Sequence, residues 1–167
     1  GLIRENIIRS GLEHISAVCM DASVYDEASA GKADVVIADL PCSGLGVLGK
    51  KTDLKYRASI EGIRELVDLQ RRILSCVQAY VKPGGVLMYS TCTVDPAENM
   101  ENVRWFLEQY PGFRLDDIRT RLCPELRDSV EKEGCIQLLP GVHRSDGFFI
   151  ARLVKETEET GKQEKPL

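Results

Sequence analysis

The chain has 167 residues, of which 43% are hydrophobic and 29% charged, a balance typical of one globular domain with its own core. Its net charge of −4 argues against a stand-alone nucleic-acid-binding domain, which is usually basic. No apolar run is long enough for a membrane span and residues 1–6 do not resemble a signal peptide, so we expect a cytoplasmic protein.

Helix-like and strand-like segments alternate along the sequence. The strand-like runs are almost continuously apolar, which suits strands that are buried on both faces. In chain order we expect a helix at 2–12, a strand at 15–20, a strand at 34–39, a helix at 59–81, a strand at 86–91, a helix from 95 onward and a strand at 148–154. This alternation predicts right-handed βαβ units and a mostly parallel sheet.

Two of the expected helices carry signals at their ends. The helix at 59–81 is followed by Lys82-Pro83-Gly84-Gly85, which stops a helix. At the start of the next helix, Asp95 can cap the first turn, Pro96 suits the first helical position, and Glu98 completes the pattern of a capping box.

The six cysteines include no Cys-x-x-Cys pair, and the chain has only two histidines. This spacing argues against a structural zinc site, and we expect no metal. A disulfide framework is equally unsupported in a chain of this size without a secretory signal. A cysteine with a chemical role must therefore be identified by its local context.

Three strand ends carry polar or sulfur-containing side chains. Ligands of parallel sheets bind beyond the carboxyl ends of the strands, which here carry Asp21, then Asp39 and Cys42, then Cys92. If the last two of these strands are neighbours, they lie about 4.8 Å apart. We therefore expect Cys42 and Cys92 to face one cleft, with Asp39 beside them.

Two thiols and a carboxylate suit the methylation of a pyrimidine at C5. A thiolate is a strong nucleophile, and its addition at C6 makes C5 enamine-like, so that C5 can attack an electrophilic methyl group. An acid near N3 neutralises the charge that develops on the ring. A base must then remove the C5 proton so that the first thiol can leave.

Three segments resemble signature motifs of the RNA cytosine-5 methyltransferase family, and they occur in the family's order. They are DLPCSGLGV at 39–47, YSTCTVDPAEN at 89–99 and LPGVHRSDGFFIA at 139–151. The similarity extends from about Leu2 to Lys155. It implies a Rossmann-like fold and the transfer of a methyl group from S-adenosylmethionine to a cytosine in ribosomal RNA.

The resemblance implies a role for each matching residue. Cys92 matches the nucleophile, and Cys42 matches the second cysteine, which helps to release the product. Asp39 matches a residue beside both the methyl donor and the base. Asp21 matches an acid near the adenosine part of the cofactor, and Pro41 shapes the pocket that these ligands share.

Some matches leave roles open. The segment 101–103, Glu-Asn-Val, is similar to a motif of DNA cytosine methyltransferases, in which the cysteine at the place of Cys42 is the nucleophile. The pair Thr91-Cys92 favours the RNA enzymes instead. The resemblance assigns no chemical role to His143 and Asp146, for which we expect a buried, hydrogen-bonded structural role. For Lys55 a contact with phosphate and a solvated side chain are both open.

The resemblance also implies parts that the sequence does not contain. The family binds S-adenosylmethionine with a glycine-rich loop after its first strand, and none precedes Asp21. In the family's strand order, 3-2-1-4-5-7-6, a fold without its first two strands leaves one edge of the strand at 34–39 exposed. We therefore expect a fragment, with residues 1–155 from the catalytic domain and a disordered tail at 156–167, that binds the cofactor weakly and self-associates through that edge.

Two other functions remain open from the sequence. The missing glycine-rich loop would also suit a catalytically inert structural or RNA-binding module, although the acidic charge argues against strong RNA binding. An adenine or amino-group methyltransferase usually carries an aromatic side chain at the place of Cys42, so the thiol argues against that class.

Overall fold

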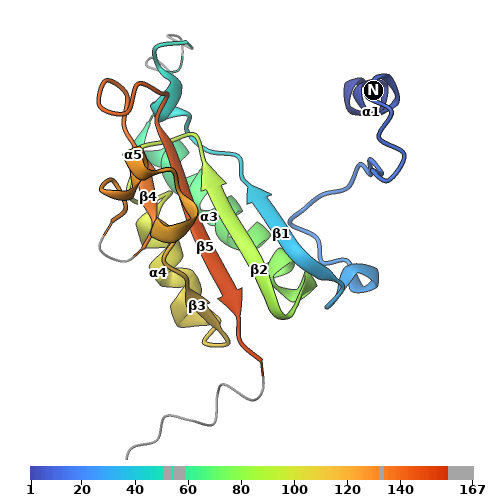
Figure 1. Ribbon diagram of the computed structural model, residues 1–167. Coiled ribbons are helices and arrows are strands. Elements are labelled where there is room, and N and C mark those ends of the chain that lie inside the picture. Colours follow the sequence, from blue (N-terminus) through green and yellow to red (C-terminus); the bar gives the residue numbers. More distant parts are fainter. Residues whose placement is uncertain (51–53, 55–58, 132–133, 158–167) are drawn as a thin grey trace, which may run out of the picture.

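The computed structural model describes residues 1–50, 54, 59–131 and 134–157, and within them a five-stranded sheet lies against two helices (Figure 1). The strands lie in the order β1-β2-β5-β3, and β4 pairs with β5 off this path. Their bounds are β1 (Ala33–Asp39), β2 (Val81–Thr91), β3 (Phe113–Leu115), β4 (Ile136–Leu138) and β5 (Phe148–Lys155). β1, β2, β3 and β5 correspond to strands 4, 5, 6 and 7 of the family, and β4 is an addition. The observed order β1-β2-β5-β3 is therefore the expected order 4-5-7-6, which is confirmed.

The pairing directions correct one expectation. β1 and β2 are parallel and are joined by α3 (Ile60–Val77), which is the predicted βαβ unit. β5 runs antiparallel to β2, β3 and β4. The prediction of a mostly parallel sheet is therefore wrong for the described pairings, because β5 returns between β2 and β3 in the opposite direction.

The core lies between the sheet and the helices α3 and α4 (Met100–Gln109), which cover the same face (Figure 1). The other helical segments are α1 (Leu2–Arg9), α5 (Pro124–Arg127) and the 3-10 turns Glu27–Ser29, Leu45–Val47, Gln78–Tyr80 and Arg119–Arg121. Alternate residues of the strands face the helices. The most deeply buried apolar side chains are Leu74, Val81, Leu87, Tyr89, Val103, Phe106, Cys135, Ile136, Ala151 and Leu153.

Two helix boundaries differ from the prediction. α3 ends at Val77, and β2 already begins at Val81, because Val81 is fully buried and pairs with Ala33 of β1. The helical spacing therefore gives way to strand pairing at Val81, and Tyr80 ends the 3-10 turn between the helix and the strand. α4 begins only at Met100, and residues 96–99 before it form turns.

The N-terminal part of the chain forms the expected helix but not the expected strand. α1 stands apart from the sheet, and residues 15–20 have no strand assignment (Figure 1). Among the described residues no strand pairs with this run, so its backbone has no ladder partner. Large apolar side chains are exposed along the segment, namely Leu2, Ile3, Ile8, Val18, Met20 and Val24.

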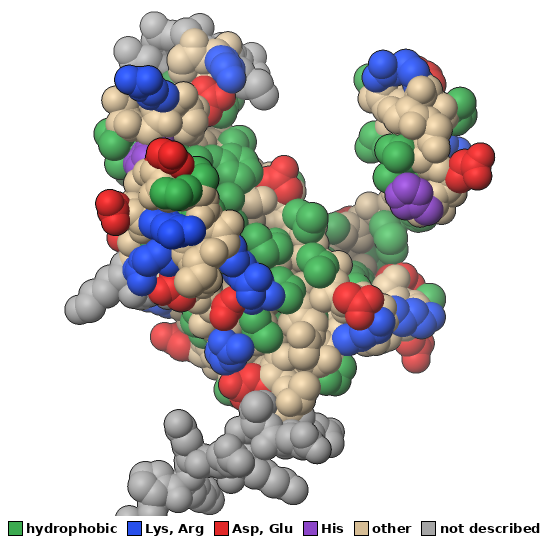
Figure 2. Space-filling model, in the orientation of Figure 1, with side chains coloured by type: hydrophobic (Ala, Val, Ile, Leu, Met, Phe, Trp, Pro, Cys, Tyr) green, Lys and Arg blue, Asp and Glu red, His purple; other side chains and the backbone are tan. Residues whose placement is uncertain are grey.

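β1 is an end strand of the sheet, as expected, but only one of its faces is covered. Ala38 is buried against the core, whereas Val35 is 56% exposed and Ile37 is 74% exposed. Figure 2 shows hydrophobic side chains on this open face of the sheet. The prediction of burial on both faces is therefore wrong for β1, since no described helix covers its second face.

After β5, the last described residues run beside the turn that precedes β3. Of the predicted disordered tail at 156–167, residues 158–167 lie outside the described residues, and the N–H of Glu156 donates to the carbonyl of Gly112. No helix in the described ranges is both long and apolar enough to cross a membrane.

We expect Leu153→Ala to lower the free energy of unfolding by about 2–5 kcal/mol, because it leaves a cavity on the strand that pairs with three others. Leu153 is 1% exposed. Urea denaturation measures the change, with Val142→Ala as the control, since Val142 is 68% exposed and its truncation should cost less than about 0.5 kcal/mol. Equal losses in the two variants would contradict this description of the core.

Candidate active site

The register of β1 against β2 brings two sequence motifs to one edge of the sheet. Asp39, the last residue of β1, pairs with Ser90 near the end of β2. The N–H of Leu40 donates to the carbonyl of Ser90 at 3.2 Å, and the Ser90 hydroxyl donates to the Asp39 carboxylate at 3.0 Å. The two loops that follow therefore start side by side, with Asp39 exposed between them.

The two predicted cysteines meet at this edge. The Sγ atoms of Cys42 and Cys92 lie 3.3 Å apart, within hydrogen-bonding distance, and both side chains are half-buried. A cavity of about 220 Å³ opens beside Cys42, and it is lined also by Ser43, Leu54, Ser59, Gly62, Ile63 and Leu66. The expectation that the two thiols lie close together is therefore confirmed.

The surroundings of Cys42 favour the protonated form of its thiol. Burial, and then the hydrogen bond with Cys92, raises the pKa of the Cys42 thiol well above its ordinary value. Two adjacent thiols cannot easily both be ionised, since like charges repel. The raised pKa therefore holds the Cys42 side chain as a thiol near neutral pH.

Two glycines allow the third motif to join the first two. The N–H of Gly46 donates to the carbonyl of Cys92 at 3.1 Å, and the N–H of Gly147 donates to the carbonyl of Gly46 at 2.7 Å. A Cβ atom on Gly46 would lie 2.3 Å from the carbonyl oxygen of Gly147. Only a residue without a side chain permits this approach, so Gly46 holds the three motifs together through their backbones.

A cluster of fully buried polar side chains, Gln70, Glu98 and Asn102, supports the loop of Cys42 from the protein interior. Glu98 is part of it, and its carboxylate accepts the N–H of Ser43 at 2.9 Å and the side-chain N–H of Gln70 at 2.9 Å. The predicted capping box is therefore wrong, because this carboxylate binds residues distant in sequence and not the helix start. Asp95 does accept the N–H of Ala97, at 2.9 Å, but in the turn that precedes α4.

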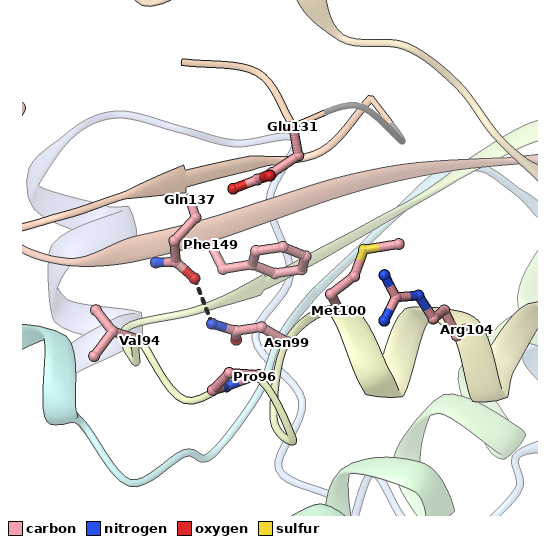
Figure 3. A pocket seen from close by; sticks show the side chains of 8 residues that line it. All are labelled: Val94, Pro96, Asn99, Met100, Arg104, Glu131, Gln137 and Phe149. Carbon is pink, nitrogen blue, oxygen red and sulfur yellow. Dashed lines mark hydrogen bonds between the residues drawn. The ribbon is translucent and has the colours of Figure 1, made fainter.

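Asn99 fixes the segment that carries Cys92. It accepts the Thr91 hydroxyl at 2.5 Å, and it donates to the carbonyl of Thr93 at 3.1 Å and to the side chain of Gln137 at 2.6 Å. Figure 3 shows the last of these bonds at the wall of a cavity of about 330 Å³. The predictions from sequence included neither Gln70 nor Gln137, although both hold the cysteine loops.

The three predicted cofactor residues, Asp21, Asp39 and Pro41, are all exposed. Asp21 lies before the first 3-10 turn, and hydrogen bonds from the hydroxyl and N–H of Ser23 hold the pKa of its carboxyl below the ordinary value. The carbonyl of Pro41 accepts the side-chain N–H of Gln70 at 2.8 Å. In the described part of the chain no hydrogen bond joins Asp21 to the cysteine loops, and its cofactor role stays a prediction.

The polar residues of the third motif form the expected hydrogen bonds, but the prediction of burial is wrong, because His143 and Asp146 are both partly exposed. Nδ1 of His143 accepts the N–H of Leu139 at 2.8 Å, and its Nε2 lies 2.9 Å from the Ser129 hydroxyl. Asp146 forms an ion pair of 2.6 Å with Lys50. The basic residues that follow Lys50 in the sequence, Lys51, Lys55 and Arg57, lie outside the described residues.

The difference between the two thiols is testable by alkylation. We expect iodoacetamide to modify Cys92 faster than Cys42 in the folded protein near pH 8, because the thiolate fraction falls about ten-fold for each unit by which a pKa is raised. Peptide mapping by mass spectrometry follows both sites. As pH rises further, labelling of Cys42 should continue to increase, and faster labelling of Cys42 than of Cys92 at pH 8 would contradict the assignment.

Gly46→Ala tests the close approach of the three motifs. The new methyl group would overlap the backbone of Gly147 and Cys92, and we expect a loss of about 1–3 kcal/mol in the free energy of unfolding. Gly49→Ala is the matched control, because a Cβ atom there meets nothing within 4 Å. Urea denaturation that finds equal effects at the two positions would rule out this role for Gly46.

Comparison with known proteins places these motifs in one family. Residues 1–154 match the family described as 16S rRNA methyltransferase RsmB/F. A Bacillus subtilis protein named probable ribosomal RNA small subunit methyltransferase B is 37% identical over 156 residues, which are 93% of this chain and 35% of that protein. The chain thus spans about a third of the length of that relative.

Solved structures agree with this assignment and with the Rossmann-like methyltransferase fold. The crystal structure of PH0851 superposes with a TM-score of 0.82 and 33% identity, over 93% of this chain and 34% of that one. The crystal structure of NSun6 from Pyrococcus horikoshii with SFG gives a TM-score of 0.73 and 28% identity, over 93% and 38% of the two chains. From its matched residues, its strand order and its joined cysteine motifs, the chain belongs to the 16S rRNA methyltransferase RsmB/F family.

Proposed function

We propose that this chain carries the covalent part of an active site that methylates C5 of a cytosine in ribosomal RNA. The observation that carries the proposal is the 3.3 Å contact between the Sγ atoms of Cys42 and Cys92, at the ends of adjacent strands. Membership of a family of 16S rRNA methyltransferases supports the class of substrate. The cytosine would have to leave the base stack to reach the thiols.

Cys92 is the nucleophile of the proposed reaction. Burial raises the pKa of Cys42 and keeps its proton in place, which argues against Cys42 as the first nucleophile and leaves that role to Cys92. The electron pair of the thiolate forms a bond to C6, and the ring electrons move toward N3. Asp39 is exposed at the same strand end, where its carboxyl group, acting as an acid, can donate a proton to N3 as negative charge develops there.

The described residues fit part of an S-adenosylmethionine site. The exposed carboxylates of Asp21 and Asp39 can accept hydrogen bonds from hydroxyl or ammonium groups, and Pro41 is exposed just after Asp39 in the sequence. The cofactor supplies an electrophilic methyl group when bound. Since no glycine-rich turn precedes Asp21 in the sequence given, we propose that this chain alone binds the cofactor weakly.

Cys42 acts after the methyl group has reached C5. Its own proton first leaves to solvent. As a thiolate it then takes the proton from C5, and the pair of electrons of that C–H bond forms the C5–C6 double bond. The bond between C6 and the sulfur of Cys92 breaks, and its electrons return to Cys92 as a thiolate. One thiolate is consumed and one is formed, so the step is balanced.

The open side of the sheet supports a proposal about assembly. β1 is an end strand, and Val35 and Ile37 are exposed on it. Unpaired backbone groups on such a strand can pair with another chain. We therefore propose that copies of this chain associate through the edge of β1.

Two single variants test the proposed roles in the complete protein that contains this chain. With ribosomal RNA and S-adenosylmethionine, Cys92→Ala should abolish methyl transfer and form no covalent adduct. Cys42→Ala should still attack the base but release it slowly, so a protein–RNA adduct should appear as a shifted band on a denaturing gel. Methyl transfer by Cys92→Ala, or adduct formation by it, would refute the assignment of the nucleophile.

A further inference from the structure

The two cysteine loops are joined by the residues that follow the thiols as well as by the thiols themselves. The hydroxyl oxygens of Ser43 and Thr93 lie 2.8 Å apart, and Thr93 is fully buried. Each of these residues is bonded through the backbone to the neighbouring cysteine. The distance between the two sulfur atoms therefore depends on this second contact.

Glu98 sets the direction of that contact. Its carboxylate accepts the N–H of Ser43 at 2.9 Å and the O–H of Ser43 at 2.5 Å. Since the Ser43 proton points to the carboxylate, the Thr93 hydroxyl must donate to Ser43, while it accepts the N–H of Asp95 at 3.2 Å. One carboxylate thus fixes both the backbone and the side chain of the residue next to Cys42.

Gln70 extends the same support to the other side of Cys42. Its side-chain nitrogen donates to the carbonyl of Pro41 at 2.8 Å and to Glu98 at 2.9 Å. Its oxygen accepts the side-chain N–H of Asn102 at 2.8 Å. Cys42 is therefore held through both of its neighbours, by a buried cluster that also includes the Tyr89 hydroxyl, which donates to the backbone carbonyl of Glu98.

The loop of Cys92 has supports of its own. Its carbonyl accepts the N–H of Gly46, and Asn99 binds Thr91 and Thr93 on either side of it. None of these bonds uses the carboxylate of Glu98. Loss of that carboxylate should therefore displace Cys42 more than Cys92.

We propose that Glu98 is a positioning residue for Cys42, required for release of the methylated base and not for the first attack by Cys92. This inference rests on the proposed function, because it assigns a support to one of its two steps. Glu98 is fully buried, and the hydrogen bonds of its carboxylate go to Ser43 and Gln70. Its effect reaches the reaction only through Ser43 and Gln70.

The test is the covalent adduct formed by the complete protein with ribosomal RNA and S-adenosylmethionine. We expect Glu98→Ala to slow adduct release by about 100-fold, the cost of a displacement of roughly 1 Å at a reacting group, while the adduct still forms. The adduct should therefore accumulate on a denaturing gel, as in Cys42→Ala. Glu98→Gln keeps an oxygen for the two N–H donors and should restore most of the release rate.

Two further variants separate positioning from general loss of structure. Val103→Ala removes buried volume from α4 without removing a hydrogen bond, and it should accumulate no adduct even where it lowers stability. Ser43→Ala removes the contacts of the hydroxyl with Glu98 and Thr93 at a half-buried position, and it should accumulate adduct even if Glu98→Ala does not fold.

Outcomes for the inference and for the proposed function can be told apart. If Cys42→Ala accumulates adduct but Glu98→Ala and Ser43→Ala do not, the role of Glu98 is overturned and the proposed function stands. If Cys42→Ala forms no adduct, the proposed function of Cys42 itself fails. Accumulation in Cys42→Ala, Glu98→Ala and Ser43→Ala, with none in Val103→Ala, supports the inference.

Discussion

The parallel pairing of β1 with β2 is the constraint on which the candidate site depends. Because Asp39 is paired with Ser90, the loops to Cys42 and Cys92 leave the sheet at the same level. Carboxyl ends lie at one edge only when strands are parallel. β5 is antiparallel to β2, so the first residues of β5 lie at this same edge. The third motif therefore lies at the start of its strand, whereas the first two motifs lie at the ends of theirs.

Hydrogen bonds and not apolar contacts determine the positions of the loops beyond this edge. Apolar burial has no direction, so it cannot by itself set two sulfur atoms 3.3 Å apart. Buried polar groups do have direction, and each costs about 1–3 kcal/mol when a partner is missing. Among the described residues every buried polar side-chain atom has a partner, so the cluster of Gln70, Glu98 and Asn102 can fix one arrangement.

The sequence allowed the strand order and the meeting of the two cysteines to be predicted, because both depend on patterns within single segments and on family motifs. The role of Glu98 could not be found in that way. Its pattern with Asp95 fits a local cap, but its partners are Ser43 and Gln70, which are 55 and 28 residues away. The sequence did contain one signal of the buried polar cluster. Gln70 is a polar residue between Leu66 and Leu74 on the apolar stripe of α3, so burial of its side chain could be expected.

Closeness of the two thiols also imposes an order on the proposed reaction. While Cys92 is a thiol or a thiolate, its hydrogen bond and its charge add to burial in raising the pKa of Cys42. Once the sulfur of Cys92 is bonded to carbon it carries no proton and no charge, and those two contributions end, while burial remains. Cys42 therefore becomes easier to ionise only after the attack has occurred. Two thiols 3.3 Å apart can thus act one after the other, whereas well-separated thiols would ionise independently.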